Sequence, residues 1–318
     1  MEAYVEAANR WLESLVYTND LQPIYHYTSP EGLKGIFDNQ VIRFTNRLYL
    51  NDKSEGIYVF DVLSGHYDEI FPSAFLDDES KNKLVRIIDE FRNGFADLIP
   101  FKVYQASFSL NKDSLPLWNY YTKGAGIDGY NIEFISNKLA DSIVSKLWAK
   151  ECGKHPYIFG HCVIYQVDKQ VEMLRSFILE VYSAIRSDNG KKTDFDTVSK
   201  QQFFNRFSSI LERILLIGTI FKSSCFTCEE EYRLFINPFD EGTLWKFENE
   251  KVKRQFNYKN GLFIPYIDLP FEFDSINSIT FSPTLSATDQ HKSLKEYIRV
   301  KSRNNDFVFH DSTIPIRY

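Results

Sequence analysis

The chain has few cysteines, no long hydrophobic run and no basic leader. Four cysteines among 318 residues are too few for the disulfide scaffold of a secreted protein of this size, so we expect reduced thiols. Glu2 and Glu6 stand where a signal peptide carries basic residues, and the longest apolar run, residues 214–221, is far shorter than the roughly 20 residues that cross a bilayer. These absences predict a cytoplasmic protein without membrane contact.

An excess of positive charge is also missing. Lys and Arg total 37 against 43 Asp and Glu, which gives a net charge of −6. A mildly acidic chain lacks the electrostatic footprint of a general duplex-DNA binder, although a local basic groove would be hidden in this average. The chain is nevertheless 43% apolar and 16% aromatic, which is enough to bury a sizeable core without disulfides or metals.

Several catalytic signatures do not occur. The sequence has no Gly-rich dinucleotide fingerprint, no phosphate-binding loop, no His-Glu-x-x-His and no Gly-x-Ser-x-Gly, so the matching reaction classes lose most of their support. By their spacing alone, cysteines and histidines could supply four zinc ligands, and the Cys225-x-x-Cys228 pair also resembles a redox motif. The residues concerned are Cys152, His155, His161, Cys162, Cys225 and Cys228. We favour packing roles for them and predict no metal.

The order of the expected elements indicates the fold class. Hydrophobic periodicity and turn residues predict a helix within the first twenty residues, ending near residues 19–20, and helices at about 30–38, 136–151, 168–187, 199–221 and 287–301. Two more are predicted within 57–98, broken at residues 71–73, and a short one through Trp118 and Tyr121, capped by Asp113. Strands are predicted at 24–28, 41–45, 102–110, 129–134, 162–167, 231–236, 262–267, 276–281 and 307–310, with Pro265 restricting its strand to a sheet edge. Strands scattered among helices without regular βαβ alternation predict an α+β fold.

Three acids lead into an otherwise apolar strand. In the run Glu229-Glu230-Glu231-Tyr232-Arg233, alternation places Glu229, Glu231 and Arg233 on one face. A carboxylate aimed inward from a strand is a candidate for chemistry. The alternative is a same-face ion pair between Glu231 and Arg233 at the edge of a sheet.

Other candidates lie in the first half of the chain. His26 stands in a β-prone run, where a lone histidine is commonly a hydrogen-bonded core residue. Ser107 and Ser109 project to one face of a predicted strand. Trp118 and Tyr121 have the flat rings that stack on a planar ligand, although core packing is the commoner role of aromatic residues.

Taken in order, these motifs resemble a known family. They are His26-Tyr27-Thr28-Ser29 with Gly32-Leu33-x-Gly35-Ile36, Asn51-Asp52-x-x-Glu55-Gly56, Ser107-Phe108-Ser109, Leu117-Trp118-x-x-Tyr121 and Glu229-x-Glu231-Tyr232-Arg233. The series resembles the bacterial domain-of-unknown-function family twenty-nine seventy-one, which is associated with the ADP-ribosyltransferase superfamily. The resemblance covers about residues 24–133, resumes at 221–236 and includes the tail at 312–317.

The resemblance implies a split antiparallel β-sheet core that holds NAD as a substrate, with no metal. It makes Glu231 the catalytic carboxylate with Glu229 as its rival, and it gives His26 a role at the adenosine-side ribose. The implied NAD-binding set is His26, Tyr27, Thr28, Asn51, Ser107, Ser109, Trp118, Tyr121 and Arg233, and the loop at 51–55 would close over substrate or activate the acceptor. A carboxylate beside the nicotinamide ribose suits this reaction because it stabilises oxocarbenium-like charge.

The resulting expectation is an NAD-dependent ADP-ribosyltransferase of toxin or phage-defence type. Its acceptor would be a macromolecule, RNA, DNA or protein, and an antitoxin would be a possible neutralising partner. Helical stretches at about 57–98 and 168–221 are interpreted as insertions in one domain spanning 1–318. The alternatives are NAD hydrolysis, a metal-assisted nuclease, and a non-catalytic nucleotide- or nucleic-acid-binding module with the same fold.

Overall fold

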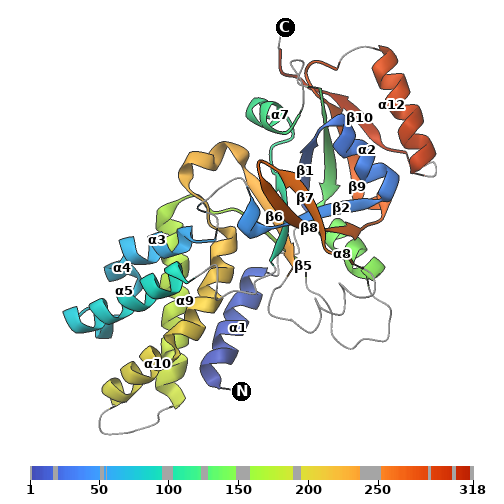
Figure 1. Ribbon diagram of the computed structural model, residues 1–318. Coiled ribbons are helices and arrows are strands. Elements are labelled where there is room, and N and C mark those ends of the chain that lie inside the picture. Colours follow the sequence, from blue (N-terminus) through green and yellow to red (C-terminus); the bar gives the residue numbers. More distant parts are fainter. Residues whose placement is uncertain are drawn as a thin grey trace. The chain divides into compact units, whose positions relative to one another are not determined.

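The chain folds into two compact units. The computed structural model describes residues 2–16, 21–50, 54, 56–94, 103–122, 128–147, 158–188, 195–236, 252–285, 288–302 and 306–315. One unit, which we call the helical unit, comprises residues 1–17, 50–101 and 163–227; the other, the sheet unit, comprises 18–49, 102–162 and 228–318. The second contains every strand of the ten-stranded sheet formed by the described residues (Figure 1). The predicted α+β class is confirmed.

The sheet is mixed and mostly antiparallel. Its main path runs β10-β9-β4-β1-β3-β2-β8-β7, with β6 pairing β3 and β5 off this path, and only β10 and β9 run parallel. The strands are β1 (Pro23–Thr28), β2 (Val41–Asn46), β3 (Tyr104–Ser109), β4 (Tyr130–Ile135), β5 (Ile158–Cys162), β6 (Glu231–Ile236), β7 (Gln255–Lys259), β8 (Leu262–Pro270), β9 (Ile276–Phe281) and β10 (Val308–Asp311).

Strand β3 is the point at which the sheet divides. Along one edge it pairs with β6 over five residues. On the other edge it meets β1 at a single pair, Tyr25 with Ser109, and β2 at two pairs near its opposite end. Between these contacts, no strand among the described residues pairs with this edge of β3 at residues 106–108. The backbone of Ser107 therefore faces a gap between β1 and β2.

Local sequence explains the helix that follows β1. Helix α2 (Pro30–Asn39) begins after Ser29, whose hydroxyl accepts a hydrogen bond from the Gly32 amide at 3.2 Å, and proline occupies the first turn. It ends at Gln40, whose left-handed conformation turns the chain into β2. Its apolar face packs into the core of the sheet unit, to which α8 (Ser136–Leu147) and α12 (Thr288–Lys301) also contribute.

The helical unit is built from helices (Figure 1). Aromatic side chains pack in its core. Phe75 packs against Tyr182 and Phe203, and Phe71 packs against Phe207. Among the described residues, no helix is long and apolar enough to span a membrane. The α-helices of the helical unit are α1 (Ala3–Val16), α3 (Tyr58–Gly65), α4 (Tyr67–Ile70), α5 (Asp78–Asn93), α9 (Val167–Asp188) and α10 (Phe195–Ile217).

Most predicted elements are present. Strand β7 was not predicted, and three predicted details were wrong. Strand β5 ends at Cys162 and α9 begins at Val167, so the strand predicted at 162–167 lies earlier. Pro265 does not place its strand at the edge, because β8 lies between β2 and β7; the β2 ladder starts after it, at Tyr266. Helices fill most of 57–98 and 168–221, in the helical unit. The interpretation of these segments as insertions in a single domain stays a prediction.

The third detail concerns helix α7 (Leu115–Tyr121). The structure places Ser114 at its N-terminus, where Asp113 was predicted to cap the helix. Asp113 instead accepts hydrogen bonds from the Trp118 indole and from Ser312 and Thr313 of the C-terminal segment. It thus ties the last described residues of the chain to α7.

Candidate functional site

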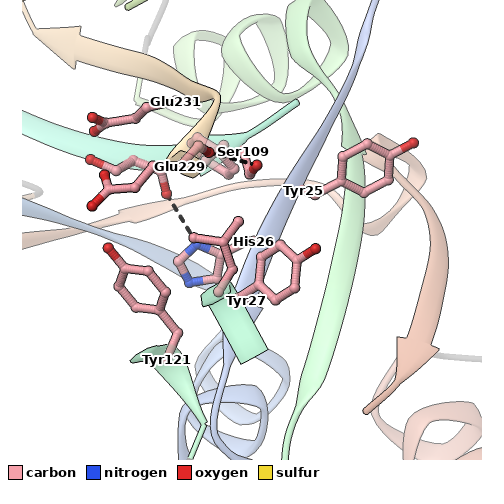
Figure 2. A pocket seen from close by; sticks show the side chains of 10 residues that line it. Tyr25, His26, Tyr27, Ser109, Tyr121, Glu229 and Glu231 are labelled. Carbon is pink, nitrogen blue, oxygen red and sulfur yellow. Dashed lines mark hydrogen bonds between the residues drawn. The ribbon is translucent and has the colours of Figure 1, made fainter. Parts of the chain in front are cut away.

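A pocket opens where β1 and β3 separate. Its cavity volume is about 60 Å³, and all the residues that line it belong to the sheet unit (Figure 2). Ten residues from β1, β3, α7 and the segment leading into β6 line it: Tyr25, His26, Tyr27, Ser107, Phe108, Ser109, Leu117, Tyr121, Glu229 and Glu231. This volume is well below the roughly 300–1,000 Å³ of pockets that enclose a drug-sized ligand, so the pocket holds only part of such a molecule.

His26 occupies the gap on β3. Its Nδ1 lies 3.4 Å from the carbonyl oxygen of Ser107 and donates to it, and its ring packs against Phe108. Burial lowers the pKa of His26, and the hydrogen bond to Ser107 opposes this only in part. The imidazole is therefore neutral at pH 7, and with its proton on Nδ1 it presents Nε2 as an acceptor for a ligand hydroxyl.

Glu231 and Arg233 form a buried bidentate ion pair. The Arg233 Nε and Nη2 atoms donate to the two Glu231 carboxylate oxygens, each at 2.9 Å, and the side chains are 5% and 0% exposed. The same-face pair considered as the alternative is therefore present, but not at a sheet edge, because β6 lies between β3 and β5. Because Glu231 also lines the pocket, the guanidinium fixes the direction of a carboxylate at its wall.

Glu229 reaches the same pocket by a different backbone route. It ends the 3₁₀ segment η4 (Ser224–Glu229), and β6 begins only at Glu231. Glu230 between them has φ +42°, a left-handed conformation that interrupts the strand. The predicted alternation therefore fails between Glu229 and Glu231 and holds only within β6. Glu229 and Glu231 nevertheless both line the pocket, and Figure 2 shows their carboxylates on one side of it. The Glu230 carboxylate instead accepts a hydrogen bond from the side-chain amide of Asn111.

The two predicted serines differ in what their side chains do. Ser109 stands opposite Glu231 in the β3–β6 ladder, and its hydroxyl donates to the carbonyl of Glu229 at 2.8 Å and accepts from the Asn111 amide. It holds the chain in place between Glu229 and β6. Ser107 stands opposite Arg233 and supplies the carbonyl that binds His26.

Of the two predicted stacking residues, only Tyr121 lines the pocket. Tyr121 is 40% exposed, and Figure 2 shows its hydroxyl directed toward the carboxylates. Trp118 is fully buried, packs edge-on against Tyr27 with ring centroids 4.8 Å apart, and donates its indole hydrogen to Asp113. A stacking role for Trp118 does not fit this packing.

The remaining predicted residues differ in their positions. Thr28 and Arg233 are buried and do not line it. Tyr27 lines it, but its hydroxyl donates to the Asn111 carbonyl and accepts from the Ser114 amide, and burial raises its pKa. Asn51 and most of the loop predicted to close over substrate lie outside the described residues.

The cysteines form no metal site among the described residues. Cys162, Cys225 and Cys228 are free thiols, and no group of three potential ligands comes together in the part of the chain that the structure describes. Cys152 and His155 lie outside that part.

Three lining residues were missed by the sequence analysis: Tyr25, Phe108 and Leu117. Tyr25 belongs to the pocket because it pairs with Ser109 across strands that are distant in sequence. No local pattern reveals that pairing. The motif positions of Phe108 and Leu117 were visible, but only as packing residues.

Residues 117–234 match a family model. The family is described as "Protein of unknown function (DUF2971)". The matched range includes α7, Glu229 and Glu231, whereas His26 and Ser107 precede it. The match confirms the family resemblance where the two overlap, at residues 117–133 and 221–234. Searches of curated proteins and of solved structures gave no match.

Proposed function

We propose that this protein is an NAD-dependent ADP-ribosyltransferase of toxin or phage-defence type acting on a macromolecule. The observation that carries the proposal is the convergence of His26, Glu229 and Glu231 on one pocket, from segments far apart in the sequence. The division of the antiparallel sheet at β3, directly beside this pocket, also supports a split-sheet NAD site.

Glu231 acts on the nicotinamide ribose. When the C1′–N bond breaks, its electron pair passes to the nicotinamide nitrogen and positive charge develops on the ribose. The carboxylate, held by Arg233, accepts a hydrogen bond from the 2′-hydroxyl and stabilises that charge without reorganisation. The Nε2 atom of His26 accepts from the ribose on the adenosine side.

Glu229 serves the acceptor. Its side chain is partly exposed, lines the pocket and belongs to a different segment from the buried Glu231. The acceptor's nucleophilic atom bonds to C1′ and loses a proton, which the Glu229 carboxylate takes. Tyr121, at the same wall, supplies the flat ring beside the nicotinamide.

Label transfer tests the proposal. Purified protein is incubated with adenine-labelled NAD and a cell lysate, which is then divided into protein, RNA and DNA fractions. We expect wild type to label one fraction. Glu231→Asp should lower labelling by about 10²–10³-fold, because the shorter side chain moves the carboxylate away from the ribose. Glu230 is a neighbouring acid outside the pocket, so Glu230→Gln should label as wild type does. Equal labelling by wild type and Glu231→Asp contradicts the role of Glu231, whereas free ADP-ribose without labelled macromolecule selects NAD hydrolysis.

One observation favours a second candidate, the non-catalytic binding module. Both Glu231 oxygens already accept from Arg233, as in a purely structural ion pair. This candidate predicts saturable nucleotide binding to wild type, measured by calorimetry, with no loss of NAD over time. NAD turnover that requires Glu231 excludes it.

A further inference from the structure

A left-handed residue separates the two acids of the pocket. Glu230 has φ +42°, and its side chain is exposed. Residues other than glycine seldom adopt this conformation, because Cβ crowds the backbone, and it persists only where neighbouring contacts hold it. Rotation about the Glu230 backbone redirects the chain before it, so the place of Glu229 beside Glu231 at the pocket (Figure 2) depends on this conformation.

The end of β3 holds the turn at Glu230. The Leu110 amide donates to the Glu230 carbonyl at 2.7 Å, and the Ser109 hydroxyl donates to the Glu229 carbonyl at 2.8 Å. The side-chain amide of Asn111 donates to the Glu230 carboxylate at 2.8 Å. Of these three contacts, the one from Asn111 reaches the side chain of the left-handed residue.

Asn111 is itself fixed on its other sides. Its backbone amide donates to the Ser109 hydroxyl at 3.0 Å, and its carbonyl accepts from the Tyr27 hydroxyl at 2.8 Å. Its side-chain oxygen accepts from the Asp113 amide at 3.0 Å, which leaves the side-chain nitrogen to donate to Glu230. Asn111 is half-buried and does not line the pocket, so it acts on a ligand only through the residues that it holds.

We propose that Asn111 is a positioning residue that directs ADP-ribose to its acceptor. By holding Glu230 in the left-handed conformation, it keeps Glu229 where it takes the acceptor's proton; the inference rests on the proposed function. Glu231 is held separately, by Arg233. Without the Asn111 contact, Glu231 still supports breakage of the C1′–N bond, but Glu229 is misplaced. Water then bonds to C1′ in place of the acceptor and releases a proton to solvent.

The ratio of labelled macromolecule to released nicotinamide tests this role. Full-length variants receive adenine-labelled NAD and cell lysate, and chromatography measures the nicotinamide. Asn111→Asp keeps the oxygen that accepts from the Asp113 amide, but it sets a second carboxylate against that of Glu230. We expect the ratio to fall by about 3- to 10-fold, roughly the factor that one hydrogen bond contributes. A general loss of stability lowers both products together and leaves the ratio unchanged.

Exchanging donor and acceptor should restore the ratio. Glu230→Gln alone keeps a side-chain oxygen that accepts from Asn111, so its ratio should equal that of wild type. In the double variant Asn111→Asp with Glu230→Gln, the introduced amide donates to the introduced carboxylate, and the ratio should recover. The matched control is Asn119, an exposed residue of α7 outside the pocket. Asn119→Asp adds the same charge and should leave the ratio unchanged. Circular dichroism verifies that each variant is folded.

The outcomes for the two proposals are separable. A wild-type ratio in Asn111→Asp, or a ratio that the double variant does not restore, overturns the positioning role alone. Nicotinamide release by wild type without labelled macromolecule selects NAD hydrolysis and overturns the positioning role, because no acceptor step remains. Absence of release from folded wild type contradicts the transferase, and the positioning role with it.

Discussion

His26 donates its Nδ1 hydrogen to the carbonyl of Ser107 across the gap where β1 and β3 separate. This contact links a side chain of β1 to residues 106–108 of β3, the stretch of that edge with which no described strand pairs. It leaves the other ring nitrogen for a ligand, and it explains why the pocket forms at this point of the sheet.

Protonation of His26 should set the acid limit of NAD binding. Since burial lowers the pKa of His26 below its ordinary value of about 6.5, neutral imidazole persists below pH 6.5. Affinity for NAD should therefore hold through pH 6.5 and fall only as the pH drops through the lowered pKa. Calorimetry at a series of pH values measures this affinity, and His26→Asn should remove its decrease at acid pH. An affinity that declines from above pH 7 in wild type would contradict the neutral-acceptor role.

The same shift links His26 to stability. The unfolded chain binds the proton more tightly than the folded one, so the contribution of neutral His26 is present above about pH 6.5 and is lost as the pH falls toward the folded pKa. His26→Asn should reduce the loss of unfolding free energy in this window, as measured by urea denaturation at several pH values.

Breaking the Glu231–Arg233 pair from one side should destabilise the fold. Removing one partner of a buried ion pair costs about 3–5 kcal/mol, whereas replacing both with apolar residues costs much less. Glu231→Gln should therefore lower the unfolding free energy strongly, and Glu231→Leu combined with Arg233→Met should recover much of it. Urea denaturation measures both. Equal destabilisation by the single and double variants would show that the pair is not coupled.

Two glycines of α2 provide a matched comparison. A Cβ at Gly32 would lie 2.1 Å from Thr28 Oγ1, whereas a Cβ at Gly35 would meet nothing within 4 Å. We expect Gly32→Ala to destabilise the protein by about 1–3 kcal/mol and to disturb β1 beside His26. Gly35→Ala should stabilise it by about 0.5–1 kcal/mol through helix propensity. Melting temperatures that move in the same direction would contradict this packing.

Asp113 should make the C-terminal segment sensitive to acid. Burial raises its pKa, but hydrogen bonds from Ser312, Trp118 and Thr313 outweigh burial and lower the pKa overall. The stabilisation is present above the ordinary pKa of about 3.9 and is lost as the pH falls through the lowered value. Asp113→Asn should speed hydrogen exchange at residues 312–314 at neutral pH, while substitution of Asp141, an exposed acid on α8, by Asn should not.

Local patterns predicted the elements well and their assembly poorly. The bounds of β6 and β9 follow from short apolar strands between turn residues, and α2 follows from Ser29-Pro30. Strand β7 was not predicted, although Asn260-Gly261 is a strong signal for a hairpin turn. The prediction for this region considered only Pro265 and not the turn. Pairings such as Tyr25 with Ser109 depend on tertiary contacts that no local signal carries.

The candidate site shows the same division. Residue type and motif order predicted that His26, Ser107, Tyr121, Glu229 and Glu231 belong together, and the pocket contains all five. The sequence did not distinguish aromatic residues that pack in the core from those that line the pocket. The structure does: Trp118 packs in a core cluster, whereas Tyr121 remains partly exposed at the pocket. The role of Ser109 likewise follows from a tertiary contact, because its hydroxyl donates a hydrogen bond to the backbone carbonyl of Glu229.

Nicotinamide release from NAD by the purified protein tests the central claim most directly. Chromatography follows the product for wild type, Glu231→Asp and Glu230→Gln, with circular dichroism to verify folding. The account predicts release by wild type and Glu230→Gln, and a rate lower by about 10²–10³ for Glu231→Asp. Release that is equal in all three proteins, or absent from folded wild type supplied with acceptor, would contradict it.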